Sequence, residues 1–332
     1  MGRRLKVLYI YREKSPYAYS LERVFRTISN HIYDATVIEY VMRGRKYLLA
    51  DIFHIRRLNA DIYHVTGDVN YIVPFLPRGK SVLTIHDIGH YLFSLKGIKR
   101  KIYKWVWLSL PIYFASVIHY PSDETKRCLT KIFNIPEAKL KFIENCVTTN
   151  VRQVEKYFNA KCPTVLQIGT RGYKNVPRLI QALHGITCKL VLVGVLEEEI
   201  KNALQETNVV YENHVGISDN ELIVLYQSCD IVSFISIGEG FGLPILEAQA
   251  SGKPLITSNI EPLCSVAGQG SYLVNPLDIN DIRKGFQNLI DDDCLRQQVV
   301  VAGLLNVKAY SPKAIADKFL ALYNEILDNV HK

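Results

Sequence analysis

Short apolar runs alternate with amphipathic stretches along the whole chain. In the first half, buried strands are predicted at residues 6–11, 36–41, 61–65, 81–85, 117–120 and 141–145. The helical spacing of apolar residues predicts helices over 20–31 and 47–58, and Ser122 is placed to cap a helix that begins at Asp123. Strands that alternate with helices in this way predict a parallel sheet covered on both faces.

The same alternation restarts after a polar stretch at residues 153–163, which we interpret as a linker. Further strands are predicted at residues 164–168, 189–193, 231–237, 253–257 and 270–274. Helices are predicted from Val176, behind a capping box at Ser218 and Glu221, from Pro244, and over 280–290 and 313–327. The chain therefore predicts two successive α/β units.

A glycine-rich turn follows the predicted strand at 231–237. Residues 238–254 read Gly-Glu-Gly-Phe-Gly-Leu-Pro-Ile-Leu-Glu-Ala-Gln-Ala-Ser-Gly-Lys-Pro. Pro244 suits the first turn of a helix, because its φ is already helical and its missing N–H is not needed there. The backbone N–H groups of Phe241, Gly242 and Leu243 are then expected to point out of the helix start, where a phosphate can bind.

Two carboxylates flank this turn: Glu239 within it, and Glu247, which we expect in the first helical turn. Acids beside a phosphate site repel the ligand unless they bind its hydroxyl groups. The combination indicates a ligand with both phosphates and a polyol, such as a nucleotide sugar. A helix terminus contributes only about 0.3–1 kcal/mol to an exposed anion, so a diphosphate beside two carboxylates also requires a cation.

Composition narrows the class of protein. At 332 residues with 48% hydrophobic content, the chain is long enough for two domains. The net charge of +8 is a mild excess over this length, and we expect no nucleic acid partner. The seven scattered cysteines indicate reduced thiols in a cytoplasmic protein and no structural zinc. No apolar run approaches the roughly 18 residues of a membrane span.

The spacing of Glu239 and Glu247 within Gly-Glu-Gly-Phe-Gly-Leu-Pro-Ile-Leu-Glu-Ala resembles the signature of the retaining nucleotide-sugar glycosyltransferases of family 4, the group 1 type with the GT-B fold. The resemblance covers most of the chain. Thr84-Ile-His-Asp87 resembles the His-Asp turn of the family's first domain, and residues 169–175 resemble its donor-phosphate loop. The closest stretch is 215–276.

The resemblance implies two Rossmann-like, doubly wound parallel-sheet domains that face each other across a cleft. Residues 1–155 would form the acceptor domain and residues 160–310 the nucleotide-sugar donor domain. Residues 312–332 would form a last helix that packs back on the first domain.

The resemblance also implies roles for individual residues. Glu247 would bind the ribose diol, and Glu239 would face the sugar hydroxyls and the positive charge that develops at the anomeric carbon. Lys174 matches the family lysine on the diphosphate, with Arg171 as its partner, although the family commonly has that arginine where Thr170 stands. Further donor contacts are expected from Gly169, Thr170, Gly240, Phe241, Gly242 and Leu243.

His86 is expected to approach the donor sugar or phosphate from the first domain. Retention in this family is usually explained by front-face substitution, in which the leaving phosphate takes the acceptor's proton and no protein nucleophile is needed. Asp87 is the nearest candidate general base. The acids at 291–293 are interpreted as a solvated turn, so we expect no metal and no cofactor besides the nucleotide-sugar co-substrate.

Each of these residues also has a purely structural interpretation. Glu247 could serve only as a partner of the helix dipole. Glu239 could be a solvated loop acid, and His86 a core histidine whose hydrogen bonds are satisfied within the protein.

A basic and aromatic segment at residues 97–118 bears on the acceptor. Its candidate residues are Lys99, Arg100, Lys101, Lys104, Trp105 and Trp107. They resemble an interfacial segment for anionic lipid, which would place the protein peripherally on the inner membrane face and favour a lipid-linked acceptor. The alternative is a partly buried helix with its basic residues in solvent.

The sequence thus predicts a retaining, metal-independent glycosyltransferase that moves a hexosyl group from a UDP- or GDP-sugar to a glycan or lipid-linked acceptor, in surface polysaccharide synthesis. One alternative is a nucleotide-sugar epimerase of the same fold, which needs no acceptor. Another is a non-enzymatic basic membrane or nucleic-acid adaptor, which would require a broken donor site.

Overall fold

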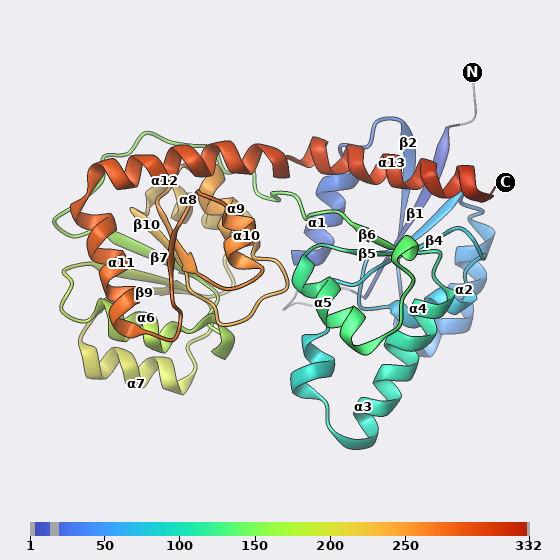
Figure 1. The fold of residues 1–332 in the computed structure, drawn as a ribbon, viewed down its shortest axis with the longest axis horizontal. Helices are drawn as coiled ribbons and strands as arrows, with labels where there is room; N and C mark the ends of the chain where they lie inside the picture. The colour runs from blue at the N-terminus through green and yellow to red at the C-terminus, as the bar shows by residue number, and fades with distance from the viewer. Residues whose placement is uncertain (1–3, 14–19, 331–332) are drawn as a thin grey trace. The chain divides into compact units, whose positions relative to one another are not determined.

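The chain folds into two compact units, each built on one parallel sheet. The computed structural model describes residues 4–13 and 20–330 (Figure 1). One unit consists of residues 1–146 and 311–332, and the other of residues 147–310. We call them unit 1 and unit 2.

The sheet of unit 1 has six strands in the order β2-β1-β3-β4-β5-β6. All of its neighbouring strands are parallel. The strands are β1 (Leu5–Tyr11), β2 (Ala35–Val41), β3 (Ile62–Val65), β4 (Ser81–Thr84), β5 (Val117–Tyr120) and β6 (Leu140–Phe142). Every residue of β3, β4 and β5 is buried, as expected for central strands of a sheet covered on both faces.

The helices of unit 1 are α1 (Ser20–Ser29), α2 (Leu48–Arg57), α3 (Gly97–Tyr103), α4 (Leu110–Phe114), α5 (Asp123–Ile132) and α13 (Pro312–Val330). A π-helical segment, Lys104–Ser109, joins α3 to α4. Ser122 caps α5 as predicted, because its side chain accepts a hydrogen bond from the Thr125 N–H. Helix α13 packs beside α1 (Figure 1).

A buried hydrogen-bond chain runs across the sheet of unit 1. The Nε2–H of His119 donates to the Ile143 carbonyl at 2.7 Å, so its Nδ1 accepts from the Thr84 hydroxyl at 2.9 Å. The Thr84 oxygen then accepts from Nε2–H of His64 at 2.7 Å. Both imidazoles are therefore neutral, and burial lowers the pKa of His64 well below its usual value and that of His119 to about 3.

The same series of hydrogen bonds continues to the C-terminal helix, α13. Nδ1 of His64 accepts from the hydroxyl of Tyr323 on α13 at 2.7 Å, and the hydroxyls of Tyr323 and Tyr9 share a hydrogen bond at 3.0 Å. Phe319, also on α13, packs against His64 and His119. Helix α13 is therefore an integral part of the core of unit 1.

The sheet of unit 2 also has six strands, in the order β12-β11-β10-β7-β8-β9. All of its neighbouring strands are parallel. The strands are β7 (Thr164–Ile168), β8 (Lys189–Val193), β9 (Val210–His214), β10 (Ile231–Phe234), β11 (Leu255–Ser258) and β12 (Tyr272–Val274). The helices are α6 (Val176–Leu183), α7 (Glu198–Thr207), α8 (Asp219–Ser228), α9 (Leu243–Ala250), α10 (Leu263–Ala267), α11 (Ile279–Asp291) and α12 (Asp293–Asn306).

The predicted α/β architecture with two parallel sheets is confirmed, whereas several local predictions were incomplete. The capping box of α8 forms as predicted between Ser218 and Glu221. The sequence patterns missed α7, β9, α10 and α12. Residues 291–293 do not form a simple solvated turn, because the Asp292 side chain accepts from the Leu295 N–H and caps α12.

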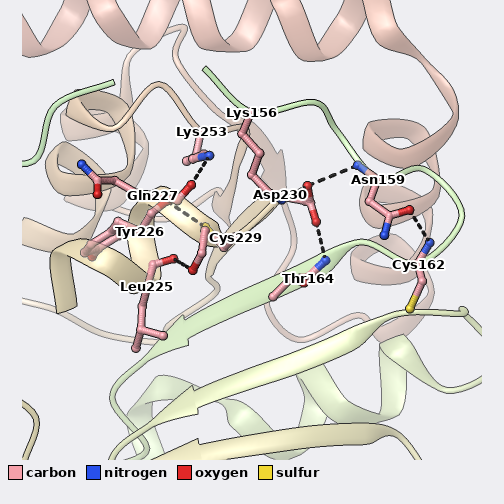
Figure 2. Close-up of polar contacts among 11 residues, drawn as sticks. Lys156, Asn159, Cys162, Thr164, Leu225, Tyr226, Gln227, Cys229, Asp230 and Lys253 are labelled. Carbon is pink, nitrogen blue, oxygen red and sulfur yellow. Dashed lines mark hydrogen bonds and ion pairs between the residues drawn. The ribbon is translucent and has the colours of Figure 1, made fainter. Parts of the chain in front are cut away.

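The polar stretch at 153–163, interpreted as a linker, is held against unit 2 by a buried carboxylate. Asp230, just before β10, forms an ion pair with Lys156 and accepts from the N–H groups of Asn159 and Thr164 at 3.2 and 2.8 Å (Figure 2). A cavity of about 740 Å³ opens beside it. This cavity lies at the amino ends of β10 and β11, the opposite edge of the sheet from the glycine-rich turn.

Candidate active site

Two loops meet at the carboxyl edge of the unit 2 sheet because their strands are neighbours. β10 pairs with β7 in parallel, so the loops that follow them leave the same edge. The Ile237 N–H donates to the Tyr173 carbonyl at 2.9 Å, and the Asn175 side-chain amide donates to the Ile235 carbonyl at 3.1 Å. These bonds hold the loop 169–175 against the glycine-rich turn.

Lys174 and Glu239 form an ion pair where these loops meet. The Lys174 ammonium donates to Glu239 Oε1 at 2.6 Å, and each side chain is 13% exposed. The same ammonium lies 4.3 Å from the centroid of the Phe234 ring. Because an ammonium has three N–H donors, Lys174 can hold Glu239 and a phosphate oxygen together.

One glycine makes room for the Lys174 side chain, and another lets the glycine-rich turn pack against Leu263. Gly169 has φ +84°, and a Cβ there would lie 3.0 Å from Lys174 Cε. Gly242 has φ +106°, and a Cβ there would lie 2.8 Å from the Leu263 side chain. A side chain at either position would combine backbone strain with a steric clash.

Thr170 and Arg171 occupy different environments. Thr170 is buried, and its hydroxyl donates to the Val195 carbonyl at 2.6 Å, which ties the loop after β7 to the loop after β8. Arg171 is exposed and stands before the short 3-10 turn Gly172–Lys174. The structure thus gives Thr170 a role in the shape of the loop and leaves the Arg171 guanidinium facing solvent.

The start of α9 follows the glycine-rich turn as predicted. Gly242 is the N-cap, and Pro244 lies in the first turn. The first N–H groups of any helix lack an intrahelical acceptor of the regular kind. At this helix start the N-cap Gly242 and Leu243 carry N–H groups, Pro244 has none, and the Ile245 N–H donates to the Gly242 carbonyl at 3.0 Å. Phe241 is buried and packs edge-on against Tyr310, while Gly240 is half-buried.

Glu247 is the fifth residue of α9 and lies just beyond the first turn, in which we expected it. The helix begins at Leu243 and has no acid in its first turn, where a carboxylate interacts most strongly with the helix dipole. The carboxylate is only 2% exposed; it accepts from the Tyr226 hydroxyl at 2.8 Å and, weakly, from the Thr148 hydroxyl at 3.4 Å. The Thr148 bond is the weaker of the two, and a ligand diol can replace it more easily.

His86 follows β4 in unit 1. Its Nε2–H donates to the Thr66 carbonyl at 2.9 Å, and its main-chain carbonyl accepts from the Thr125 hydroxyl at 2.8 Å. Burial lowers the pKa of His86, so the imidazole is neutral near pH 7. Nδ1 is buried and has no hydrogen-bond partner in the described part of the chain. Asp87 is exposed, and its carboxylate caps the local turn through the Gly89 N–H.

The basic and aromatic segment does not present all of its predicted residues to solvent. Trp105 is 63% exposed, whereas Trp107 stacks on Tyr103 at 5.5 Å and lies under the Arg45 guanidinium. Arg100 and Lys104 lie on aromatic rings of unit 1, and Lys99 and Lys101 are exposed.

Two properties of the described residues bear on other kinds of site. They contain no group of three or more His, Cys, Asp or Glu side chains placed to hold a metal ion. Among the helices formed by residues 20–330, none is both long and apolar enough to cross a bilayer.

The sequence patterns missed three residues that support the site. Tyr226 and Thr148 hold Glu247, and Asn175 ties the two loops together. Asn175 adopts a left-handed conformation with φ +62°, and asparagine at the end of a loop is a recognisable signal for it. The contacts of Tyr226 and Thr148 join residues distant in sequence, and no local pattern indicates them.

Parts of this sequence are similar to known proteins. Residues 152–304 match the family model described as "Glycosyl transferases group 1". O-antigen chain mannosyltransferase B of Escherichia coli is 28% identical over 280 residues, which cover 75% of this chain and 70% of that protein. D-inositol 3-phosphate glycosyltransferase of Corynebacterium diphtheriae is 35% identical over 107 residues, 32% of this chain and 25% of that protein.

The whole fold also has solved counterparts. The crystal structure of Anabaena Alr3699/HepE in complex with UDP and glucose superposes with a TM-score of 0.78 over 97% of this chain and 100% of that one. The two sequences are 15% identical, so this likeness bears on the fold.

Proposed function

We propose that this chain, a group 1 glycosyltransferase with the GT-B fold, transfers a hexosyl group with retention from a nucleoside-diphosphate sugar to a glycan or lipid-linked acceptor. The observation that supports this most is the Lys174–Glu239 pair, which places a cation and an acid 2.6 Å apart at the carboxyl edge of the unit 2 sheet. We propose further that no metal ion is required, because Lys174 supplies the positive charge.

In this proposal the donor binds along the carboxyl edge of β7 and β10. Its diphosphate contacts the Lys174 ammonium and the N–H groups at the start of α9. Glu247, held by Tyr226, binds the ribose diol, which replaces the weak bond from Thr148. Glu239 keeps a second carboxylate oxygen for the sugar hydroxyls.

Transfer proceeds by front-face substitution. The bond between the anomeric carbon and the phosphate oxygen breaks, and a bond from the acceptor oxygen forms on the same face. The acceptor's proton passes to the departing phosphate oxygen, so no protein nucleophile takes part. Lys174 stabilises the charge on the phosphate, and Glu239 stabilises the positive charge at the anomeric carbon.

In the proposed mechanism the imidazole of His86 is neutral. Its Nε2–H is engaged by the Thr66 carbonyl, so Nδ1 is left with a lone pair that accepts hydrogen bonds. An acceptor nitrogen suits a hydroxyl group rather than a phosphate. We therefore propose that His86 contacts a sugar hydroxyl.

The similarity to O-antigen chain mannosyltransferase B favours mannose as the sugar and surface polysaccharide as the product. The test is a transfer assay with GDP-mannose, UDP-glucose and UDP-N-acetylglucosamine as donors and octyl glycosides of mannose, galactose and N-acetylglucosamine as acceptors. We expect one donor to be consumed only when an acceptor is present. NMR of the product should show that the anomeric configuration is retained. Addition of EDTA should leave the rate of transfer unchanged. Inversion would contradict the mechanism, and conversion of the donor without acceptor would indicate an epimerase.

A further inference from the structure

Helix α3 and the π-helical segment after it expose a row of apolar side chains. Ile98 is 74% exposed, Ile102 is 57% exposed and Trp105 is 63% exposed. Their spacing of four and then three residues places them on one face of a helix. We call these three residues the α3 ridge.

The opposite face of the same helix is attached to unit 1. The Arg100 guanidinium lies 4.6 Å from the centroid of the Tyr91 ring, and the Lys104 ammonium lies 5.3 Å from that of Phe133. Tyr103 stacks on Trp107. The helix therefore cannot bury its ridge by rolling over without losing these contacts.

The charged side chains on the helix that carries the ridge are all basic. Lys99 and Lys101 are exposed beside it, and their ammonium groups form no ion pair with any residue that the structure describes. No acidic residue occurs between Asp87 and Asp123 in the sequence, although this stretch contains four lysines and one arginine. An apolar row bordered by unpaired cations fits an apolar layer covered by anions.

We propose that the α3 ridge inserts into the interface of an anionic phospholipid bilayer. Ile98, Ile102 and Trp105 then lie among the upper acyl chains, while Lys99 and Lys101 contact the lipid phosphates. A second copy of the chain fits this surface less well, because it would bring two sets of lysines together.

This inference deepens the proposed function, on which its purpose rests: a membrane-bound enzyme meets a lipid-linked acceptor at the bilayer surface. Vesicle binding, however, is measured without donor or acceptor. Loss of binding and loss of transfer are therefore separate results.

The test uses the full chain and vesicles of phosphatidylglycerol or phosphatidylcholine. We expect co-sedimentation with phosphatidylglycerol vesicles and much less with phosphatidylcholine vesicles. The double variant Ile98→Ser with Ile102→Ser should weaken binding by roughly tenfold or more, because two side chains lose an apolar environment. Lys99→Glu with Lys101→Glu should weaken binding to the anionic vesicles.

The matched control is Val224→Ser with Val301→Ser, which changes two exposed apolar residues of unit 2 and should bind as the wild type does. The chain has two tryptophans, so brominated acyl chains should quench the exposed Trp105 more strongly than Trp107. The proposal would be overturned if the wild-type protein did not bind anionic vesicles. It would also be overturned if the Ile98→Ser, Ile102→Ser variant bound them as tightly as the wild type. A lipid-free dimer that the ridge variant converts to a monomer would overturn it as well.

Discussion

The ammonium of Lys174 and the carboxylate of Glu239 are 2.6 Å apart, although 64 residues separate them in the sequence. Both side chains are largely buried, at 13% exposure each. The glycine at position 169 leaves the space that the lysine side chain fills. The pair thus fixes a cation and an acid at one point on the edge of the unit 2 sheet.

Replacement of Lys174 by glutamine should lower kcat/KM for the donor by about 100-fold, because the departing phosphate loses a charged hydrogen-bond donor. Steady-state kinetics with a varied donor measures this effect. Lys201→Gln is the matched control, since Lys201 is an exposed lysine of unit 2 paired with Glu198. If the Lys174→Gln enzyme had wild-type kinetics, the donor diphosphate would not bind at Lys174.

Replacement of Glu239 by glutamine should lower kcat by about 100-fold while the donor KM changes little. The carboxylate acts mainly on the positive charge that develops in the transition state. The exposed Glu206 serves as control through Glu206→Gln, which should leave both constants unchanged. A large rise in KM with an unchanged kcat would instead assign Glu239 to ground-state binding.

Tyr226→Phe should weaken donor binding and the fold together. It removes the hydroxyl that donates to buried Glu247, and a hydrogen bond to a charged group contributes about 1.5–3 kcal/mol. We expect the donor KM to rise about tenfold. The free energy of unfolding should fall by about 1.5–3 kcal/mol, the contribution of this hydrogen bond. Tyr211→Phe changes a half-exposed tyrosine of β9 and should do neither. If the Tyr226→Phe variant loses stability but keeps its KM, Glu247 does not bind the donor.

Unit 1 should lose stability as the pH falls below about 6.5. Burial lowers the pKa of His119 to about 3 in the folded chain, against about 6.5 in the unfolded chain. The unfolded chain therefore binds the proton first, and stability is full above that range and declines toward pH 3. His119 should cost about 2 kcal/mol between pH 7 and pH 5.

Chemical denaturation at the two pH values measures this loss. A His119→Asn variant should be less stable at pH 7, because the Thr84 hydrogen bond is disturbed. It should nevertheless lose less stability on acidification than the wild type. Equal losses in the two proteins would show that His119 is not the titrating group.

Local signals predicted much of the fold. Strands such as β4 and β5 are fully buried, so they stand out as apolar runs, and Ser122 and Ser218 cap helices through their nearest residues. β9 was missed because it is an edge strand with Val210 and Tyr211 largely exposed, which leaves no apolar run. Helix α12 was missed because its start was interpreted as a solvated turn.

The candidate site residues lie in motifs that the sequence shows directly, whereas their contacts with one another do not follow from the sequence. The glycine-rich turn and the loop at 169–175 are contiguous motifs. Lys174 reaches Glu239 because β10 lies next to β7 in the sheet. Neither motif indicates this order of strands. The burial of Glu247 under Tyr226 depends in the same way on how α8 packs against α9.

The most direct test of the account is calorimetric titration of UDP and GDP into the wild type, Lys174→Gln and Glu239→Gln. Because Glu239 neutralises Lys174, removal of the acid should leave nucleotide binding as tight as in the wild type or tighter. Removal of the lysine should weaken it by about tenfold or more, the usual effect of losing a charged hydrogen bond. We predict that one of the two nucleotides binds the wild type, that Lys174→Gln weakens this binding, and that Glu239→Gln does not weaken it. If neither nucleotide binds, or if Lys174→Gln binds as tightly as the wild type, the donor site is not at this pair.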